Sequence, residues 1–281
     1  MLTTDEHDAF RAVVREFARK ELAPHVDEWE AAHELPLAAV AKMAELGLFG
    51  ISFEEEWGGG GGDFTSLCIA IEEIGYVSQS LGITLSAGVG LGANPIHSFG
   101  TPAQRAEWLP ALVAGTSLGA FGLTEPDAGS DAGATRTKAQ YDTASDEWVI
   151  DGAKAFITNS GTPITSLVTV TALTGPGEIS ALVVPAGTPG MIVEPAYDKL
   201  GWHASDTHGL TFVDCRVPAA NLLGERGQGL RNFLTILDDG RIAISALALG
   251  ASRACLDLSV EYAQQRNAFG GPIGRFQGLA F

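Results

Sequence analysis

The stretch 121–131, Phe-Gly-Leu-Thr-Glu-Pro-Asp-Ala-Gly-Ser-Asp, combines small residues with hydroxyl side chains in a way that suits ligand contact. Gly122 and Gly129 carry no side chain, so backbone amides there can approach a flat heterocycle and its phosphates closely. Thr124 and Ser130 offer hydroxyls that donate or accept hydrogen bonds. The alternative is an ordinary Asp/Gly/Ser turn between a helix and a strand.

Three later stretches carry further side chains of interest. Phe156-Ile-Thr places an aromatic residue before β-branched ones, which is also good strand material. Residues 238–241 read Asp-Asp-Gly-Arg, and Arg266 opens a glycine-rich segment that runs to Gln277. The planar fork of an arginine can bind a phosphate with two hydrogen bonds, although a solvated or ion-paired face is the commoner setting of a helical arginine.

The elements that must position these residues follow from hydrophobic periodicity. Apolar residues recur at helical spacing in four early stretches, 3–20, 36–46, 63–77 and 102–113. Short alternating β-branched runs follow from about residue 118, and helical spacing returns over 226–265. This order predicts an α+β fold. We expect an N-terminal all-α domain over 1–116, a central β-barrel or sandwich domain over 117–224, and the start of an incomplete C-terminal helical bundle over 225–281.

Residues 121–131 closely resemble the first motif of the acyl-CoA dehydrogenases. Residues 152–160 resemble that family's second flavin-contacting strand, commonly W-I-T-N-G, with Phe156 at the usual tryptophan position. Residues 237–244 and 265–277 resemble two further family blocks, so the resemblance covers essentially the whole chain. It implies FAD as the cofactor. The FAD contacts that it implies within one chain are Phe121, Gly122, Leu123, Thr124, Gly129, Ser130, Phe156, Ile157 and Thr158.

The resemblance also assigns residues to a neighbouring protomer and to the substrate. Those implied to reach FAD across a subunit boundary are Arg266, Phe269 and Gln277. Those implied to contact acyl-CoA are Ser130, Asp238, Asp239, Gly240 and Arg241. A homotetramer and an electron-transfer flavoprotein as the electron acceptor are expected on the same ground.

The chemistry implied is α,β-dehydrogenation of an acyl-CoA thioester, in which a carboxylate removes the α-proton and hydride passes to the flavin near Thr158. The likeness of residues 237–244 to one subgroup implies short or branched acyl chains, as in fatty-acid β-oxidation or branched-chain amino-acid catabolism. In most relatives the base is a glutamate in the C-terminal part, which would lie beyond Phe281. A minority branch carries a glutamate where this chain has Gly240. A shorter carboxylate at Asp238 or Asp239 would miss a geometry that tolerates little displacement, so we expect neither to be the base.

Composition excludes several function classes. The formal charge of −17 speaks against nucleic acid or an anionic membrane as the main partner. Three cysteines without C-x-x-C spacing and an acidic, polar start favour a reducing compartment and a cytoplasmic location, and a processed organellar protein would share these features. The six histidines lack paired metal-ligand spacing, so no metal is expected. No apolar run reaches membrane-span length without glycine, polar or charged interruption, so no span is expected.

Two other functions stay open at this point. A related flavin oxidase or monooxygenase would use the same fold, because a fold does not fix the chemistry. A truncated, non-catalytic flavin-binding subunit would explain the chain end at Phe281. The glycine-rich segment 58–62 lacks the Gly-Lys-Ser/Thr ending of a phosphate loop and is expected to be a flexible loop between helices. Gly88-x-Gly90-x-Gly92 does not follow a strand in a βαβ unit, so no Rossmann NAD site is expected there.

Overall fold

The computed structural model describes residues 3–281, and its N-terminal part is a layer of helices, of which α1, α4, α5 and α7 start at a side-chain cap. Asp63 accepts a hydrogen bond from the amide of Ser66 at the start of α4 (Phe64–Val77). Thr101 and Gln104 form a capping box at α7 (Pro102–Val113). The capping box of α1 (Asp5–Phe17) uses Thr4 and His7, within the predicted helical stretch 3–20. The other helical elements here are η1 (Ala18–Leu22), η2 (Ala23–His25), α2 (Val26–Ala32), α3 (Leu37–Glu45), η3 (Glu55–Trp57), α5 (Gln79–Ser86), η4 (Ala87–Ala93) and α6 (Asn94–Phe99).

A single sheet of eight strands follows the helices, in the order β6-β7-β3-β2-β4-β5-β8, with β1 paired to β4. The β1–β4 pair is parallel, whereas β3 pairs antiparallel with β2 and β7. The strands are β1 (Leu118–Gly122), β2 (Lys138–Asp142), β3 (Glu147–Thr158), β4 (Thr165–Gly175), β5 (Glu178–Pro185), β6 (Met191–Ala196), β7 (Thr207–Pro218) and β8 (Leu222–Leu223). The short helices η5 (Ala132–Ala134) and η6 (Ala219–Asn221) lie in its connections.

The sheet curls over without closing into a barrel, and two apolar cores result. One core joins the N-terminal helices to β4, β5 and the first half of the last long helix. The other core lies on the inner, concave side of the sheet. It takes side chains from β3, β4 and β7, among them Trp148, Val170 and Phe212. The predicted α+β architecture, with a β region between two helical regions, is therefore confirmed.

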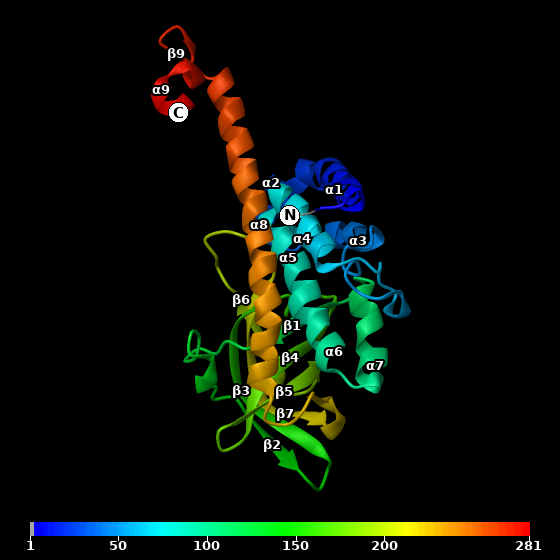
Figure 1. The fold of residues 1–281 in the computed structure, drawn as a ribbon. Helices are drawn as coiled ribbons and strands as arrows, with labels where there is room; N and C mark the ends of the chain where they lie inside the picture. The colour runs from blue at the N-terminus through cyan, green and yellow to red at the C-terminus, as the bar shows by residue number, and fades with distance from the viewer. Residues whose placement is uncertain (1–2) are drawn as a thin grey trace.

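The last long helix, α8 (Gly229–Gln265), has 37 residues and is about 55 Å long. It passes the sheet, α5 and α4, and its far end projects from the rest of the molecule with β9 (Asn267–Ala268), β10 (Gly271–Pro272), η7 (Ile273–Arg275) and α9 (Gln277–Ala280) (Figure 1). Glycines make the crossing with α4 close. A Cβ atom at Gly250 would lie 2.4 Å from the Glu72 carbonyl oxygen, so the backbones are in contact there.

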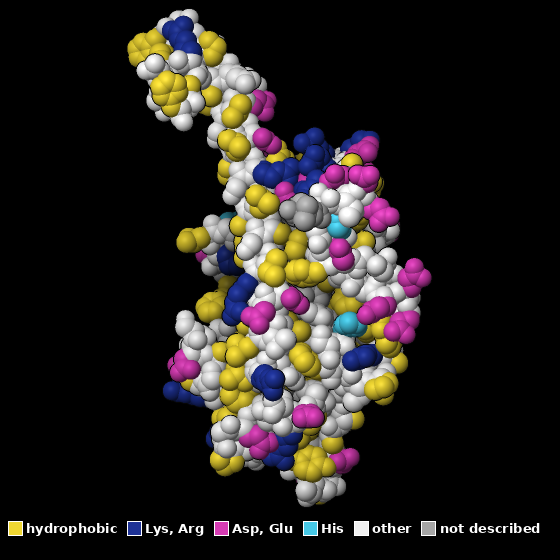
Figure 2. All heavy atoms as spheres, in the orientation of Figure 1, with side chains coloured by type: hydrophobic (Ala, Val, Ile, Leu, Met, Phe, Trp, Pro, Cys, Tyr) yellow, Lys and Arg dark blue, Asp and Glu magenta, His cyan; other side chains and the backbone are white. Residues whose placement is uncertain are grey.

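Much of the projecting half of α8 is apolar and exposed, and Figure 2 shows hydrophobic side chains along it and at its tip. Over the described residues, α8 alone is long and apolar enough to cross a membrane by length and composition, with 17% of the tested window buried. Arg253 lies within α8 and pairs with Glu72 and Glu73 of α4. This ion pairing and the contact at Gly250 place the middle of α8 against protein.

Candidate functional site

The two stretches singled out by the sequence lie side by side. The amide of Ala155 in β3 donates a hydrogen bond to the carbonyl of Thr124, with an N–O distance of 2.9 Å. The segment after β1 therefore runs against the end of β3 and forms one wall with it. Residues 121–131 and 156–158 are brought together by tertiary structure, as a shared ligand site requires.

The first three residues of this wall face the interior. Phe121 stacks on Phe233 of α8 with ring centroids 3.9 Å apart, and Leu123 is buried. Gly122 is buried in β1, and a Cβ atom there would lie 2.9 Å from Val170 and 3.3 Å from the Lys154 side chain. The missing side chain at Gly122 thus makes room for packing. At these three positions the side chain is either packed inside the protein or absent.

The next residues are more open. Thr124 is half-buried, and Gly129 and Ser130 are exposed. A Cβ atom at Gly129 would meet nothing within 4 Å. The loop therefore presents two hydroxyls and an unobstructed backbone to its surroundings.

Phe156 leaves the regular strand geometry. Its φ is 61°, a left-handed conformation that costs free energy in a bulky residue, and 66% of it is exposed. The ring lies tilted against Tyr197 with a centroid distance of 4.8 Å. Ile157 points into the inner core of the sheet, whereas Thr158 is half-buried at the end of β3. A ligand along this strand would meet the ring of Phe156, the backbone of Ile157 and the hydroxyl of Thr158.

A buried ion pair stands behind the wall. Nζ of Lys154 lies 2.7 Å from Oε1 of Glu125, and the two side chains are 0% and 3% exposed. Burial lowers the pKa of Lys154 to about 8, although Glu125 opposes that shift. Burial alone would raise the pKa of Glu125, but the hydrogen bond and charge of Lys154 outweigh it and the pKa is lowered. Both groups are charged at neutral pH.

The block 238–241 lies on α8 beside two small cavities. Asp238 is exposed and paired with Arg241. Gly240 and Arg241 line a largely apolar cavity of about 240 Å³, and Asp239 and Gly240 line a second one of about 170 Å³. Four of the five predicted substrate contacts therefore share one region of α8, and three of these line cavities. Ser130 belongs to the wall instead.

Sequence reasoning missed the opposite side of these cavities. Gly90, in the π-helical segment η4, lines both of them, and Ile83 and Leu91 line the larger one. A Cβ atom at Gly90 would meet nothing within 4 Å, so this glycine keeps space open. The available signal was the pattern Gly88-x-Gly90-x-Gly92, which the sequence excludes as a Rossmann fingerprint but does not link to the substrate.

The residues expected to serve a neighbouring protomer lie at the far end of α8. Arg266 is 33 positions beyond Phe233, which is about 50 Å along a helix. Phe269 is 89% exposed, and Gln277 begins the short helix α9. Within one chain the structure does not bring these residues to the wall.

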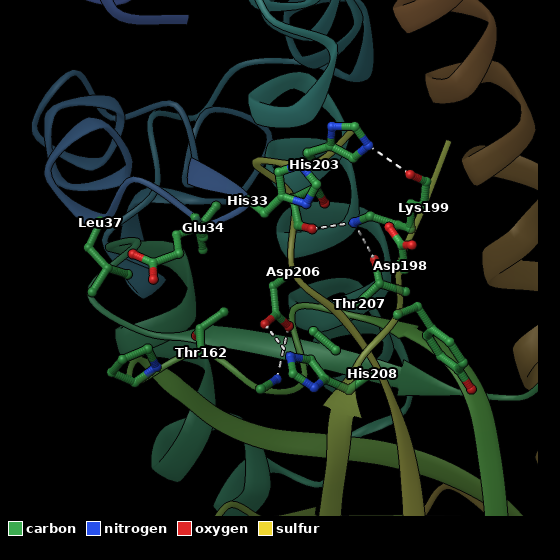
Figure 3. A pocket seen from close by; sticks show the side chains of 16 residues that line it. His33, Glu34, Leu37, Thr162, Asp198, Lys199, His203, Asp206, Thr207 and His208 are labelled. Atoms are coloured by element: carbon green, nitrogen blue, oxygen red, sulfur yellow. Dashed lines mark hydrogen bonds and ion pairs between the residues drawn. The ribbon is translucent and has the colours of Figure 1, made fainter. Parts of the chain in front are cut away.

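A cavity of about 620 Å³ lies where the segment before α3 meets the sheet. Its labelled side chains are drawn in Figure 3. His33 stacks on His203 at 4.0 Å, and Asp206 lies 2.8 Å from His208. The sequence predicts no ligand-binding role for the histidines, and the structure places His33, His203 and His208 in the lining of this cavity. Tyr197 lines it too and joins it to Phe156. Among residues 3–281 no group of three or more possible metal ligands is found.

Comparison with known proteins gives consistent matches along the chain. Residues 4–116 match the family model for the acyl-CoA dehydrogenase N-terminal domain, residues 120–215 the middle domain, and residues 227–281 the C-terminal domain. A probable acyl-CoA dehydrogenase of Bacillus subtilis, YngJ, is 48% identical over 99% of this chain and 73% of its own length.

Solved structures agree with these matches. Butyryl-CoA dehydrogenase from Megasphaera elsdenii superposes with a TM-score of 0.95 at 41% identity, over 100% of this chain and 74% of that one. An acyl-CoA dehydrogenase from Bacillus anthracis in complex with FAD gives a TM-score of 0.94 at 33% identity, over 99% of this chain and 47% of that one.

Proposed function

This chain belongs to the acyl-CoA dehydrogenase family, and we propose that it binds FAD and catalyses the α,β-dehydrogenation of short- or branched-chain acyl-CoA thioesters. The observation that carries the proposal is the wall formed by residues 121–131 and 156–158, held together by the hydrogen bond from Ala155 to Thr124. The Bacillus anthracis relative solved with FAD supports the choice of cofactor.

The residues of the wall fit FAD. The exposed ring of Phe156 and the half-buried hydroxyl of Thr158 suit a flat ring system, which would lie along β3. The open backbone at Gly129 and the hydroxyl of Ser130 suit the phosphates, because exposed amides and hydroxyls can donate to them. Bound FAD would supply the acceptor for the hydride that leaves the substrate.

The cavities on α8 fit the acyl chain. Ile83, Leu91 and Ile244 line the larger cavity, and such lining excludes water and binds alkyl groups through the hydrophobic effect. Arg241 stands at its margin, where a cation can meet the polar part of acyl-CoA. The choice of short or branched chains is supported by the resemblance of residues 237–244 to that subgroup and by the butyryl-CoA dehydrogenase among the similar structures.

The reaction needs a carboxylate that is basic enough to remove a weakly acidic α-proton, which calls for desolvation. Asp238 and Asp239 are exposed, and Asp238 is also ion-paired with Arg241. An exposed or paired carboxylate is a weak base. We therefore assign the role of catalytic base to neither residue.

Two partners belong to the proposal. Electron-transfer flavoprotein would accept the electrons, as the family resemblance implies. A homotetramer would bring Arg266, Phe269 and Gln277 of one protomer to the FAD of another, since Arg266 lies about 50 Å along α8 from Phe233 at the wall of its own chain.

Anaerobic mixing of the FAD-loaded full-length protein with butyryl-CoA or isobutyryl-CoA tests the proposal. We expect loss of the visible flavin absorbance without oxygen, and slow return of colour in air unless electron-transfer flavoprotein is added. Fast return with formation of hydrogen peroxide would favour an oxidase instead. FAD binding without any bleaching would indicate a non-catalytic flavin-binding subunit, and failure to bind FAD would refute the proposal altogether.

A further inference from the structure

Lys154 and Glu125 form the most deeply buried ion pair among residues 3–281. Besides the contact with Glu125, Nζ of Lys154 donates to the carbonyl of Leu123 at 3.3 Å and to the hydroxyl of Thr171 at 3.1 Å. Taking two charges out of water costs free energy, and an apolar pair of similar volume often stabilises a fold as well or better. Global stability alone is therefore a poor explanation for this pair.

The carboxylate of Glu125 joins the two ends of the 125–137 loop. It accepts hydrogen bonds from the amide of Arg136 at 2.7 Å and from the amide of Thr137 at 3.1 Å. One side chain thus holds the two ends of the 125–137 loop together. The exposed part of that loop contains Gly129 and Ser130.

The ammonium group of Lys154 in β3 binds Glu125 and so holds the base of this loop against β3. Lys154 precedes Ala155, whose amide binds Thr124, and lies two residues before Phe156. Because Gly122 lacks a side chain, the stem of Lys154 fits against β1, where a Cβ atom would lie 3.3 Å from it. The same buried ion pair therefore holds both the 125–137 loop and the strand that carries Phe156.

We propose that Lys154 and Glu125 are positioning residues, which lock the 125–137 loop against β3 so that Thr124, Ser130 and Phe156 present one pre-formed surface to the bound ligand. The proposal rests on the proposed FAD site. Neither side chain touches the ligand, because both are buried behind the wall. Their effect is to lower the ordering cost that a mobile loop would add to binding.

Two single variants test it, Lys154→Met and Glu125→Gln, with Lys42→Met and Glu21→Gln as controls. The control pair also has a short N–O distance, 2.5 Å, but its side chains are 48% and 45% exposed and lie on helices. The first readout is trypsin cleavage after Arg136 in the ligand-free protein, with cleavage after the exposed Arg226 as an internal reference. The second is the Kd of FAD for the apoprotein, measured well below the unfolding temperature.

We expect cleavage after Arg136 to become about tenfold faster and FAD binding about tenfold weaker in both variants, since a hydrogen bond to a charged group contributes about that factor or more. The controls should match the unmodified protein in both readouts. Folded variants that are cleaved and bind FAD like the unmodified protein would overturn the proposal.

If a single variant does not fold, the double variant Lys154→Met with Glu125→Leu replaces the pair by apolar side chains. It should fold but keep the open loop and the weak binding, because the amides of Arg136 and Thr137 lose their acceptor. Normal cleavage and FAD affinity in that double variant would contradict the proposal. Failure of the unmodified protein to bind FAD would refute the proposed function. It would leave the proposal about the loop open to test, because the cleavage comparison does not depend on FAD.

Discussion

Replacing Glu73 by Gln should destabilise the protein in a pH-dependent way. Glu73, on α4, has a side chain only 1% exposed. Its carboxylate accepts hydrogen bonds from Arg11 at 2.6 Å, from Arg15 at 2.9 Å and from Arg253 of α8 at 2.8 Å. These three arginines and Glu72 make up the cluster that ties α1, α4 and α8 together. The substitution keeps the shape of the side chain and removes its charge.

The magnitude follows from the pKa of Glu73. Burial alone would raise it, but the hydrogen bonds and charges of the arginines outweigh burial and lower the pKa from an ordinary 4.5 to about 2. A lowered carboxylate pKa contributes stability that is present above 4.5 and lost as pH falls towards 2. The shift corresponds to about 3 kcal/mol. We expect Glu73→Gln to lower the free energy of unfolding by about that amount at pH 7, and the melting temperature by roughly 6 to 12 °C.

Urea unfolding followed by circular dichroism, from pH 7 down to pH 3, measures the effect. The difference between the two proteins should shrink below pH 4.5, as Glu73 of the unmodified protein takes up a proton. Glu16→Gln is the control, because Glu16 forms an exposed pair with Lys20 and should leave the midpoint almost unchanged. A loss that is equally large at pH 3 and pH 7, or no loss at pH 7, would refute the reasoning.

Two further substitutions test the placement of α8. Gly250→Ala should cost about 1–3 kcal/mol in urea unfolding, because the new Cβ atom meets the backbone of α4, whereas Gly201→Ala meets nothing and should be neutral; equal effects would contradict the close crossing. Arg266→Ala in the FAD-loaded protein should weaken retention of FAD on gel filtration far more than Arg19→Ala on the exposed face of η1, and similar retention would argue against a cross-subunit role.

Local sequence predicted those parts of the fold that local interactions decide. Helices begin at the predicted stretches 63–77 and 102–113, where Asp63 and Thr101 cap them, because a cap needs only the next three residues. The β-branched runs became strands because branched side chains favour an extended backbone. The helices over 79–99 were not predicted individually, since glycines and serines weaken helical propensity there. Tertiary contact overrides that propensity, as at Gly82, where a Cβ atom would lie 2.4 Å from Leu247.

The candidate site divides in a similar way. The motif residues 121–131 and 156–158 could be found because their types suit a ligand and their order resembles a known family. Lys154 and Glu125 could not be singled out, because isolated charged residues are usually exposed. Arg11 has the local sequence of a surface helix residue, yet it contacts Glu72 and Glu73 some sixty positions away.

The amino-acid sequence by itself determined the order of the helical and β regions and which residue types suit contact with a ligand. Only the tertiary structure decided which of those side chains are buried and which are exposed, where the cavities lie, and which charges are buried together. The physical reason is range. Caps, turns and periodicity act over a few residues, whereas burial and ion pairing depend on whatever distant segment the fold brings alongside.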